Sequence, residues 1–246
     1  MPHFSNDEVE RYARHLVLAE IGGPGQQKLK AARVLIVGAG GVGSPAALYL
    51  AAAGVGTLGL IDPDTVALSN LQRQILFTGE DIDRTKVEAG ADRLTALNRH
   101  VRIETHAEPL NADNAAALIG DYDVVLDGTD DFHTRLVVNA ACVATGTPLV
   151  SGALGRWSGQ VGVFTGKPCY QCLVPEIPPD AETCSRVGVV GALAGIIGAM
   201  AALETIKLIT AAGQPLTARL MLYEGLSATA RTVKISADPE CPVCGG

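Results

Sequence analysis

Short apolar runs alternate with helical patterns along the first half of the chain. The run Val34–Val37 is mostly β-branched and has no polar member, which is typical of a strand buried on both faces of a parallel sheet. A glycine-rich turn follows, a helix of small residues begins at Ser44-Pro45 and continues to Ala53, and a second apolar run ends at Ile61. This order of strand, glycine turn, helix and strand predicts one half of a dinucleotide-binding fold.

A helical arm precedes this unit, and further alternation follows it. Residues 5–31 have a helical pattern that opens with the capping box of Ser5 and Glu8 and is broken at Gly22–Gly25. After the unit we expect a loop from residue 69, a helix at 86–97, strands at 101–104 and 122–126, a helix at 134–144 and a strand at 148–151. This repetition predicts one mostly parallel sheet with helices on both faces.

The second half of the chain has a different pattern. The segments 160–164, 219–223 and 232–235 are typical of antiparallel strands, and they flank a loop at 175–184 and a long apolar Gly/Ala-rich helix. We therefore predict an α/β fold, a Rossmann-like mostly parallel sheet extended by a C-terminal antiparallel portion. The expected organisation is a single domain, 1–246, made of a helical arm (1–30), a nucleotide-binding half (31–152) and a second half (153–246).

Charge and hydropathy narrow the range of partners. The formal net charge of −7 argues against nucleic acid or an anionic membrane as the main partner, because both attract cationic surfaces. The apolar stretch 187–202 is followed at once by Glu204 and Lys207 and is too short for a membrane span, which indicates a core or interface helix. The N-terminus is polar and charged, unlike a signal peptide, so we expect a cytoplasmic protein.

Candidate ligand-binding residues follow the predicted strands. In an open parallel sheet, ligands collect at the carboxyl ends of the strands, which would gather the glycine turn, Asp62, Asp64 and residues 127–131 around one crevice. The glycines let backbone N–H groups approach a phosphate at the start of the helix. They are Gly38, Gly40, Gly41 and Gly43. Asp62 is placed to bind a ribose hydroxyl, or it is an ordinary loop acid.

Two further pairs of charged residues have more than one interpretation. Asp130 and Asp131 either hold Mg²⁺, which prefers oxygen ligands, or cap the helix that begins nearby. Arg73 and Lys86, considered alone, are expected to be solvated surface cations in an acidic protein.

The six cysteines include two pairs with metal-ligand spacing. These pairs are Cys169-x-x-Cys172 and Cys241-x-x-Cys244. Each short spacer lets two thiolates reach one ion, and the two pairs together predict a closed tetrahedral site of the structural zinc type. Such a site would fasten the C-terminal segment to residues 169–172. A disulfide pair or a redox motif is the alternative interpretation.

Several motifs together identify a family. They are Arg11-Tyr12-x-Arg14, Gly38–Ser44, Asp62-x-Asp64, Ser69–Gln74, Lys86, Asp127-x-Thr129-Asp130, Gly159-Gln160, both cysteine pairs and Glu204-x-x-Lys207-Leu208. With these motifs the whole chain resembles the E1-like adenylyltransferases of the ThiF/MoeB/HesA family. These enzymes activate ubiquitin-like sulfur carriers of the MoaD/ThiS type in molybdopterin and thiamine biosynthesis.

The resemblance implies an activity and assigns the site residues. The glycine turn would serve ATP, with Gly41 and Asp62 on the nucleotide and the loop residues Ser69 and Asn70 beside it. Asn70, Arg73 and Lys86 would bind the phosphates and Asp130 would hold Mg²⁺. Arg14 would reach the phosphates from the neighbouring subunit of a homodimer. Residues 153–246 would bind the β-grasp carrier, whose C-terminal Gly-Gly carboxylate attacks the α-phosphorus and releases pyrophosphate.

Three points depart from the family pattern or stay open within it. Asp131 stands where the family commonly has Asn. Relatives place a cysteine at the position of Cys184 that bonds covalently to the carrier in some members and is dispensable in others. The chain carries no appended rhodanese domain, so a separate protein is expected to donate sulfur.

Two other function classes are considered beside the adenylyltransferase. A nicotinamide-dependent oxidoreductase would account for the glycines and Asp62 but would leave the motif Ser69–Gln74 and Lys86 without a role. A non-catalytic scaffold for a ubiquitin-like partner would not require the four residues Arg14, Arg73, Lys86 and Asp130 together.

Overall fold

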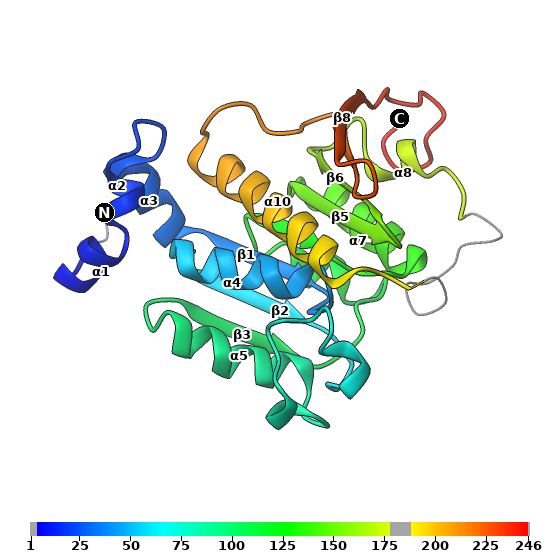
Figure 1. The fold of residues 1–246 in the computed structure, drawn as a ribbon. Helices are drawn as coiled ribbons and strands as arrows, with labels where there is room; N and C mark the ends of the chain where they lie inside the picture. The colour runs from blue at the N-terminus through cyan, green and yellow to red at the C-terminus, as the bar shows by residue number, and fades with distance from the viewer. Residues whose placement is uncertain (1–3, 178–187, 246) are drawn as a thin grey trace.

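A single eight-stranded sheet runs through the protein (Figure 1). The computed structural model describes residues 4–177 and 188–245. The strand order is β3-β2-β1-β4-β5-β6-β7-β8. The strands are β1 Arg33–Val37, β2 Thr57–Ile61, β3 Arg102–His106, β4 Val124–Asp127, β5 Leu149–Gly155, β6 Ser158–Phe164, β7 Arg219–Glu224 and β8 Thr229–Lys234. Neighbours from β3 to β5 pair in parallel, and neighbours from β5 to β8 pair antiparallel. The predicted fold class is confirmed.

Helices cover both faces of the sheet. They are α1 Asn6–Arg11, α2 Ala13–Leu16, α3 Gly22–Ala31, α4 Gly43–Ala53, α5 Lys86–Leu97, α6 Ala115–Ile119, α7 Phe132–Thr145, α8 Tyr170–Leu173 and α10 Gly191–Thr210. Side chains of β1 alternate between two apolar cores, since Val34 and Ile36 join the core beneath α4, α5 and α10, and Leu35 and Val37 join the core beneath α6 and α7. Burial on both faces explains why this strand is a continuous apolar run.

The N-terminal arm differs from the prediction at its glycine cluster. The capping box of Ser5 and Glu8 forms as expected, but Gly22–Gly25 begin α3 instead of breaking the helical arm. Gly22 has φ +53 and starts the helix, and Pro24 lies in the first turn, where the missing N–H has no partner to lose. A Cβ on Gly25 would lie 3.0 Å from Ile21, so the small residue permits close packing.

The long helix α10 packs beside α4 and over β5 and β6 (Figure 1). Glycine makes this packing possible, because a Cβ on Gly198 would lie 2.4 Å from Pro45 and one on Gly159 would lie 2.4 Å from Ile197. Among the described helices, α10 alone is long and apolar enough to span a membrane by length and composition, and a core helix passes the same test. Its inner face includes the buried Glu204, whose carboxylate binds Lys207 and the Leu216 N–H.

Candidate active site

A cavity of about 880 Å³ opens where β1, β2 and β4 end. Parallel strands end at the same edge of a sheet, so the loops that follow them meet there. Most of the residues that the sequence assigned to nucleotide or metal binding line this cavity. They are Gly38, Gly40, Gly41, Asp62, Asp64, Asn70, Arg73, Lys86, Asp130 and Asp131.

The glycine turn brings backbone close to backbone. Gly38 has φ +87, a conformation that favours glycine. Gly43 is buried in the first turn of α4, outside the cavity wall, and a Cβ there would lie 1.9 Å from the Gly38 carbonyl oxygen. Gly43 therefore shapes the turn by packing, while Gly40 and Gly41 face the cavity. The start of α4 at this edge provides a partial positive charge suited to an anion.

Asp62 and Lys86 form a buried charged pair on the cavity wall. Asp62 accepts hydrogen bonds from the Ala39 and Asp64 N–H groups at 2.8 and 2.9 Å. The Lys86 ammonium lies 3.6 Å from Asp62 and 2.7 Å from Asp64. Burial raises the pKa of Asp62 above its ordinary value, and Lys86 acts in the opposite direction. Lys86 is therefore a buried residue in the first turn of α5, and the expectation of a solvated surface cation is wrong.

The loop after β2 carries the second cation. Arg73 is partly exposed on the cavity wall, where its guanidinium donates to the Ser69 carbonyl oxygen at 3.1 Å. Ser69 itself is not part of the wall in the described structure, and Asn70 faces the cavity. The Asn70 side chain accepts from the Ala67 N–H at 3.1 Å and so closes its own turn.

Gln74 follows Arg73 and also lines the cavity, although the sequence predicts no role for it. Its side chain is buried. Its Oε1 is the one buried side-chain nitrogen or oxygen within residues 4–177 and 188–245 that has no hydrogen-bond partner. An unpaired buried oxygen is destabilising by about 1–3 kcal/mol, so a donor from a ligand or a water fits this position. Its place at the end of the motif Ser69–Gln74 was the signal available in the sequence.

The aspartate that ends β4 and the two in the loop after it have separate roles. Asp127 is buried and accepts from Thr129 and Arg135, so it is an internal partner and not the crevice acid that the sequence predicts. Asp131 caps α7, accepting from the Thr134 N–H and hydroxyl at 2.7 Å each. Burial acts to raise the pKa of Asp131, but these bonds outweigh it and lower the pKa. Asp130 is exposed on the cavity wall and is the carboxylate suited to a metal ion.

Arg135 on α7 was also not assigned from the sequence. Its guanidinium is buried and donates to Asp127 at 3.1 Å, to the Ser151 hydroxyl at 2.9 Å, and to the carbonyl oxygens of Thr129 and Gly152. Nothing in its sequence context distinguishes it from a surface helix residue. Burial of an arginine with four hydrogen bonds at the cavity wall indicates that it holds the loop which carries Asp130.

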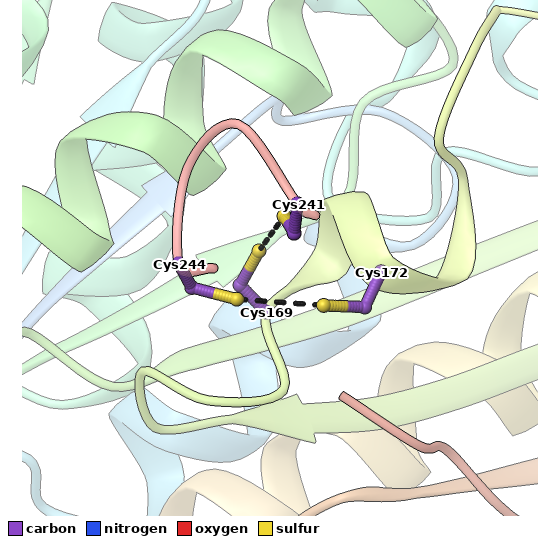
Figure 2. A group of neighbouring side chains, drawn as sticks. All are labelled: Cys169, Cys172, Cys241 and Cys244. Carbon is purple, nitrogen blue, oxygen red and sulfur yellow. Dashed lines mark hydrogen bonds between the residues drawn. The ribbon is translucent and has the colours of Figure 1, made fainter. Parts of the chain in front are cut away.

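The four paired cysteines converge from two distant segments (Figure 2). All four sulfurs lie within 4.8 Å of one another, with Cys169 3.7 Å from Cys241 and Cys172 3.4 Å from Cys244. The edge of a tetrahedron of thiolates around Zn²⁺ is about 3.8 Å, so the donor set fits this ion. All four cysteines are free thiols, which contradicts the disulfide interpretation. Burial opposes ionisation at Cys241, but nearby N–H donors outweigh it and lower its pKa to about 7.

Two predicted site residues remain, Arg14 and Cys184. Arg14 is exposed on α2, apart from the cavity in the described structure. Cys184 lies outside the described residues.

A second cavity, of about 430 Å³, adjoins the first. It lies beside β5 to β8 and shares Ala153, Leu154 and Gln160 with the larger cavity. Its wall includes Gly155 and Gly159, so a narrow segment of chain can approach the sheet there. The larger cavity offers cations for phosphate oxygens and a carboxylate for a hard cation, and the smaller one offers an approach from the surface.

Comparisons with known proteins find relatives along nearly the whole chain. The model of the ThiF family matches residues 12–243. The adenylyltransferase and sulfurtransferase MOCS3 of Anopheles gambiae is 48% identical over 245 residues, covering 98% of this chain and 56% of that protein. The sulfur carrier protein adenylyltransferase of Thermus thermophilus is 42% identical over 251 residues, covering 98% of this chain and 93% of that protein. This chain therefore spans about half of the first relative and nearly all of the second.

Solved structures with this fold are also found. The crystal structure of E. coli MccB with AMPCPP and MccA has a TM-score of 0.84 and 26% identity, covering 96% of this chain and 74% of that chain.

Proposed function

This chain belongs to the ThiF family, and we propose that it adenylates the C-terminal Gly-Gly carboxylate of a ubiquitin-like sulfur carrier at the expense of ATP. The observation that carries the proposal is the convergence of Arg73, Lys86 and Asp130 around the glycine turn in one cavity. The names of the MOCS3 and Thermus relatives support adenylation of a sulfur carrier. The MccB structure with AMPCPP supports a nucleotide in this fold.

The residue types suit this chemistry. A C-terminal carboxylate has a pKa of about 3.5 and is ionised at neutral pH, so its attack on the α-phosphorus needs no general base. The attacking oxygen forms the acyl-phosphate bond as the bond to pyrophosphate breaks. Arg73 and Lys86 would bind the phosphates and stabilise the charge that pyrophosphate carries away. Asp62 would orient the ribose.

Two metal ions are part of the proposal. Asp130 would hold Mg²⁺, which neutralises phosphate charge when bound. The four cysteines would hold Zn²⁺ with no ligand position left over, so their role would be structural. Whether Asp131 adds to the Mg²⁺ site stays a prediction, because its carboxylate already caps α7.

The carrier would dock on residues 153–246. The second cavity supports this assignment, since it leads from the antiparallel strands to the nucleotide cavity through shared residues. A tail of two glycines is narrow enough to follow that route. The organisation proposed is one adenylation domain over residues 1–246, with a nucleotide-binding half at 31–152. The carrier could belong to molybdopterin or to thiamine biosynthesis. A separate protein in the cytoplasm would donate the sulfur.

A homodimer would complete the site. Tyr49 on α4 and Leu203 on α10 are 58% and 57% exposed on adjacent helices, and the outer face of α10 continues this apolar surface with Ile196 and Met200. We infer that a second copy covers this surface and that Arg14 acts on the phosphates of the neighbouring subunit. Mixing Arg14→Ala with Asp130→Ala subunits should then restore activity that neither variant has alone.

ATP–pyrophosphate exchange with Mg²⁺ and purified carriers, added one at a time, tests the activity. We expect exchange with at least one carrier, and its loss in folded Arg73→Ala and Asp130→Ala proteins. Exchange that persists in both variants would contradict the site assignment. A folded, metal-loaded protein without exchange would favour a scaffold, and tight NADH binding would favour an oxidoreductase.

A further inference from the structure

Two buried amide side chains hold the last turn of α4. A helix leaves its final carbonyl oxygens without partners inside the helix, so these atoms need donors from elsewhere. The Asn98 amide donates to the Ala51 carbonyl oxygen at 2.7 Å, and the Gln26 amide donates to the Ala53 carbonyl oxygen at 2.8 Å. Both amides are fully buried and come from segments far apart in the sequence. The end of α4 is therefore a fixed point where these segments meet.

The Asn98 amide also anchors the N-terminal arm. It donates to the Tyr12 hydroxyl at 2.9 Å, and the Tyr12 side chain is buried. The ring of Tyr12 packs against Gly54, the residue that follows α4, where a Cβ would overlap the ring. The arm is thus attached to the end of α4 by a hydrogen bond and by close packing.

The Gln26 amide provides a second anchor for the arm. Its oxygen lies 2.9 Å from Nδ1 of His15, which belongs to α2. Because the Gln26 nitrogen donates to the Ala53 carbonyl oxygen, the Gln26 oxygen is the atom that faces His15 and accepts. His15 therefore carries a proton on Nδ1 and donates it to Gln26.

Arg14 lies between these two anchors, which are Tyr12 and His15. Its side chain is exposed, and its guanidinium has no hydrogen bond or ion pair within residues 4–177 and 188–245. All five of its N–H donors are free for an acceptor outside this part of the chain. A free cation on a backbone that is held on both sides is suited to reach a separate molecule.

We propose that His15, through Gln26, is a positioning residue that directs Arg14 toward the phosphates of the neighbouring subunit. This proposal rests on the proposed function, including its homodimer. Tyr12 would still fasten the arm if the His15 anchor were lost, so the fold should stay intact. Arg14 would gain alternative positions, and a misplacement of about 1 Å can cost about 100-fold in rate.

The first test compares three variants in carrier-dependent ATP–pyrophosphate exchange. His15→Ala removes the Nδ1 donor, and we expect exchange to fall at least about tenfold. His15→Asn should keep most of the exchange, because its amide N–H₂ can donate from the place of Nδ1. His100→Ala is the matched control, since it removes another partly buried histidine, two residues after Asn98, and should behave like wild type. Equal exchange in His15→Ala and wild type would overturn the proposal, and so would an equal loss in His15→Asn.

The second test determines which subunit's site depends on His15. Dimers of mixed composition are purified with a different affinity tag on each subunit. In a dimer of Arg14→Ala with Asp130→Ala, one site has an intact Asp130 and receives Arg14 from the other subunit. A dimer of His15→Ala with Asp130→Ala should reach the same exchange rate, because its site with Asp130 receives Arg14 from the subunit with an intact His15.

A dimer of His15→Ala with Arg14→Ala should stay at least about tenfold less active, because only a misplaced Arg14 remains. A weak dimer of His15→Ala with Asp130→Ala would show that His15 serves its own subunit's site, which would overturn the proposal and leave the proposed activity standing. An inactive dimer of Arg14→Ala with Asp130→Ala, beside active wild type, would refute both the exchange of Arg14 between subunits and this proposal. Wild type without exchange would refute the proposed function itself.

Discussion

The ammonium of Lys86 lies 2.7 Å from the Asp64 carboxylate, and the Lys86 side chain is only 6% exposed. A buried ammonium needs a close anion, and Asp64 with the nearby Asp62 meets this need before any ligand binds. A triphosphate in the same cavity would offer further oxygens to the same ammonium. If the cavity binds ATP as proposed, Lys86 would be fixed in advance at the place where phosphate charge develops.

Replacing Lys86 by alanine should abolish most of the adenylation activity. The two aspartates would lose their cation, and the departing pyrophosphate would lose one of its donors. Loss of a preorganised donor of this kind reduces kcat by about 100- to 1,000-fold. Carrier-dependent ATP–pyrophosphate exchange measures the effect. Lys207→Ala is the control, because Lys207 is also paired with an acid, Glu204 at 2.6 Å, but lies on α10. Equal exchange in the two variants would refute the role of Lys86.

Changing Asp130 and Asp131 to asparagine, one at a time, should have different effects on Mg²⁺ dependence and stability. Asp130→Asn removes the free carboxylate on the cavity wall, so the Mg²⁺ concentration for half-maximal exchange should rise at least about tenfold with little change in stability. Asp131→Asn keeps a capping side chain on α7 but weakens it, so we expect a loss of about 0.5 kcal/mol or less and near-normal Mg²⁺ dependence. Magnesium titrations and thermal unfolding of both proteins distinguish the two roles. The reverse pattern would assign the metal to Asp131.

Much of the fold was predictable because short apolar runs and helical patterns alternate along the first half of the chain. The helix expected at 86–97 has the observed bounds of α5, since Thr85 caps its start by accepting from the Glu88 N–H. The glycine cluster misled the prediction at α3, where Gly22 starts the helix with φ +53 and Gly25 packs closely against Ile21. The short helices α6 and α8 were missed because four or five residues carry too little periodicity.

The site was predictable where residues adjoin strand ends and not where tertiary burial decides. The positions of Asp62 and the glycine turn followed from the order of strand, glycine turn, helix and strand along the chain. Burial of Lys86, Gln74 and Arg135 depends on contacts from distant segments, such as Ser151 and Gly152 on β5 for Arg135. No local pattern records such contacts.

Removing one sulfur from the cysteine cluster should destabilise the whole chain. When the free metal concentration is about 1,000 times the Kd of the site, metal binding stabilises the folded protein by about 4 kcal/mol. Cys241→Ser should therefore lose bound zinc and unfold at a lower temperature. Chelation should lower the unfolding temperature of wild type and leave that of the variant unchanged. Cys142→Ala is the control, because Cys142 lies on the buried side of α7 and is not part of the cluster. A full zinc content in Cys241→Ser would contradict the four-sulfur site.

Glu104 on β3 should give a measurable pH dependence of stability. Its carboxylate accepts from the Tyr122 hydroxyl at 2.8 Å and from Arg33 at 2.9 Å. Burial acts against ionisation, but these partners outweigh it and hold the pKa of Glu104 below its ordinary value of 4.5. A lowered pKa means that the stabilisation is complete above about pH 4.5 and is lost as the pH falls through the folded-state pKa.

Glu104→Gln should therefore lower the free energy of unfolding by about 1.5 kcal/mol near pH 7, and the difference from wild type should shrink on acidification below about pH 4.5. Urea unfolding at a series of pH values measures this difference. Glu10→Gln, on the exposed surface of α1, corrects for the general effect of removing one negative charge. A difference that stays constant into the acid range would show that the contribution of Glu104 comes from its shape and neutral hydrogen bonding, and not from its charge.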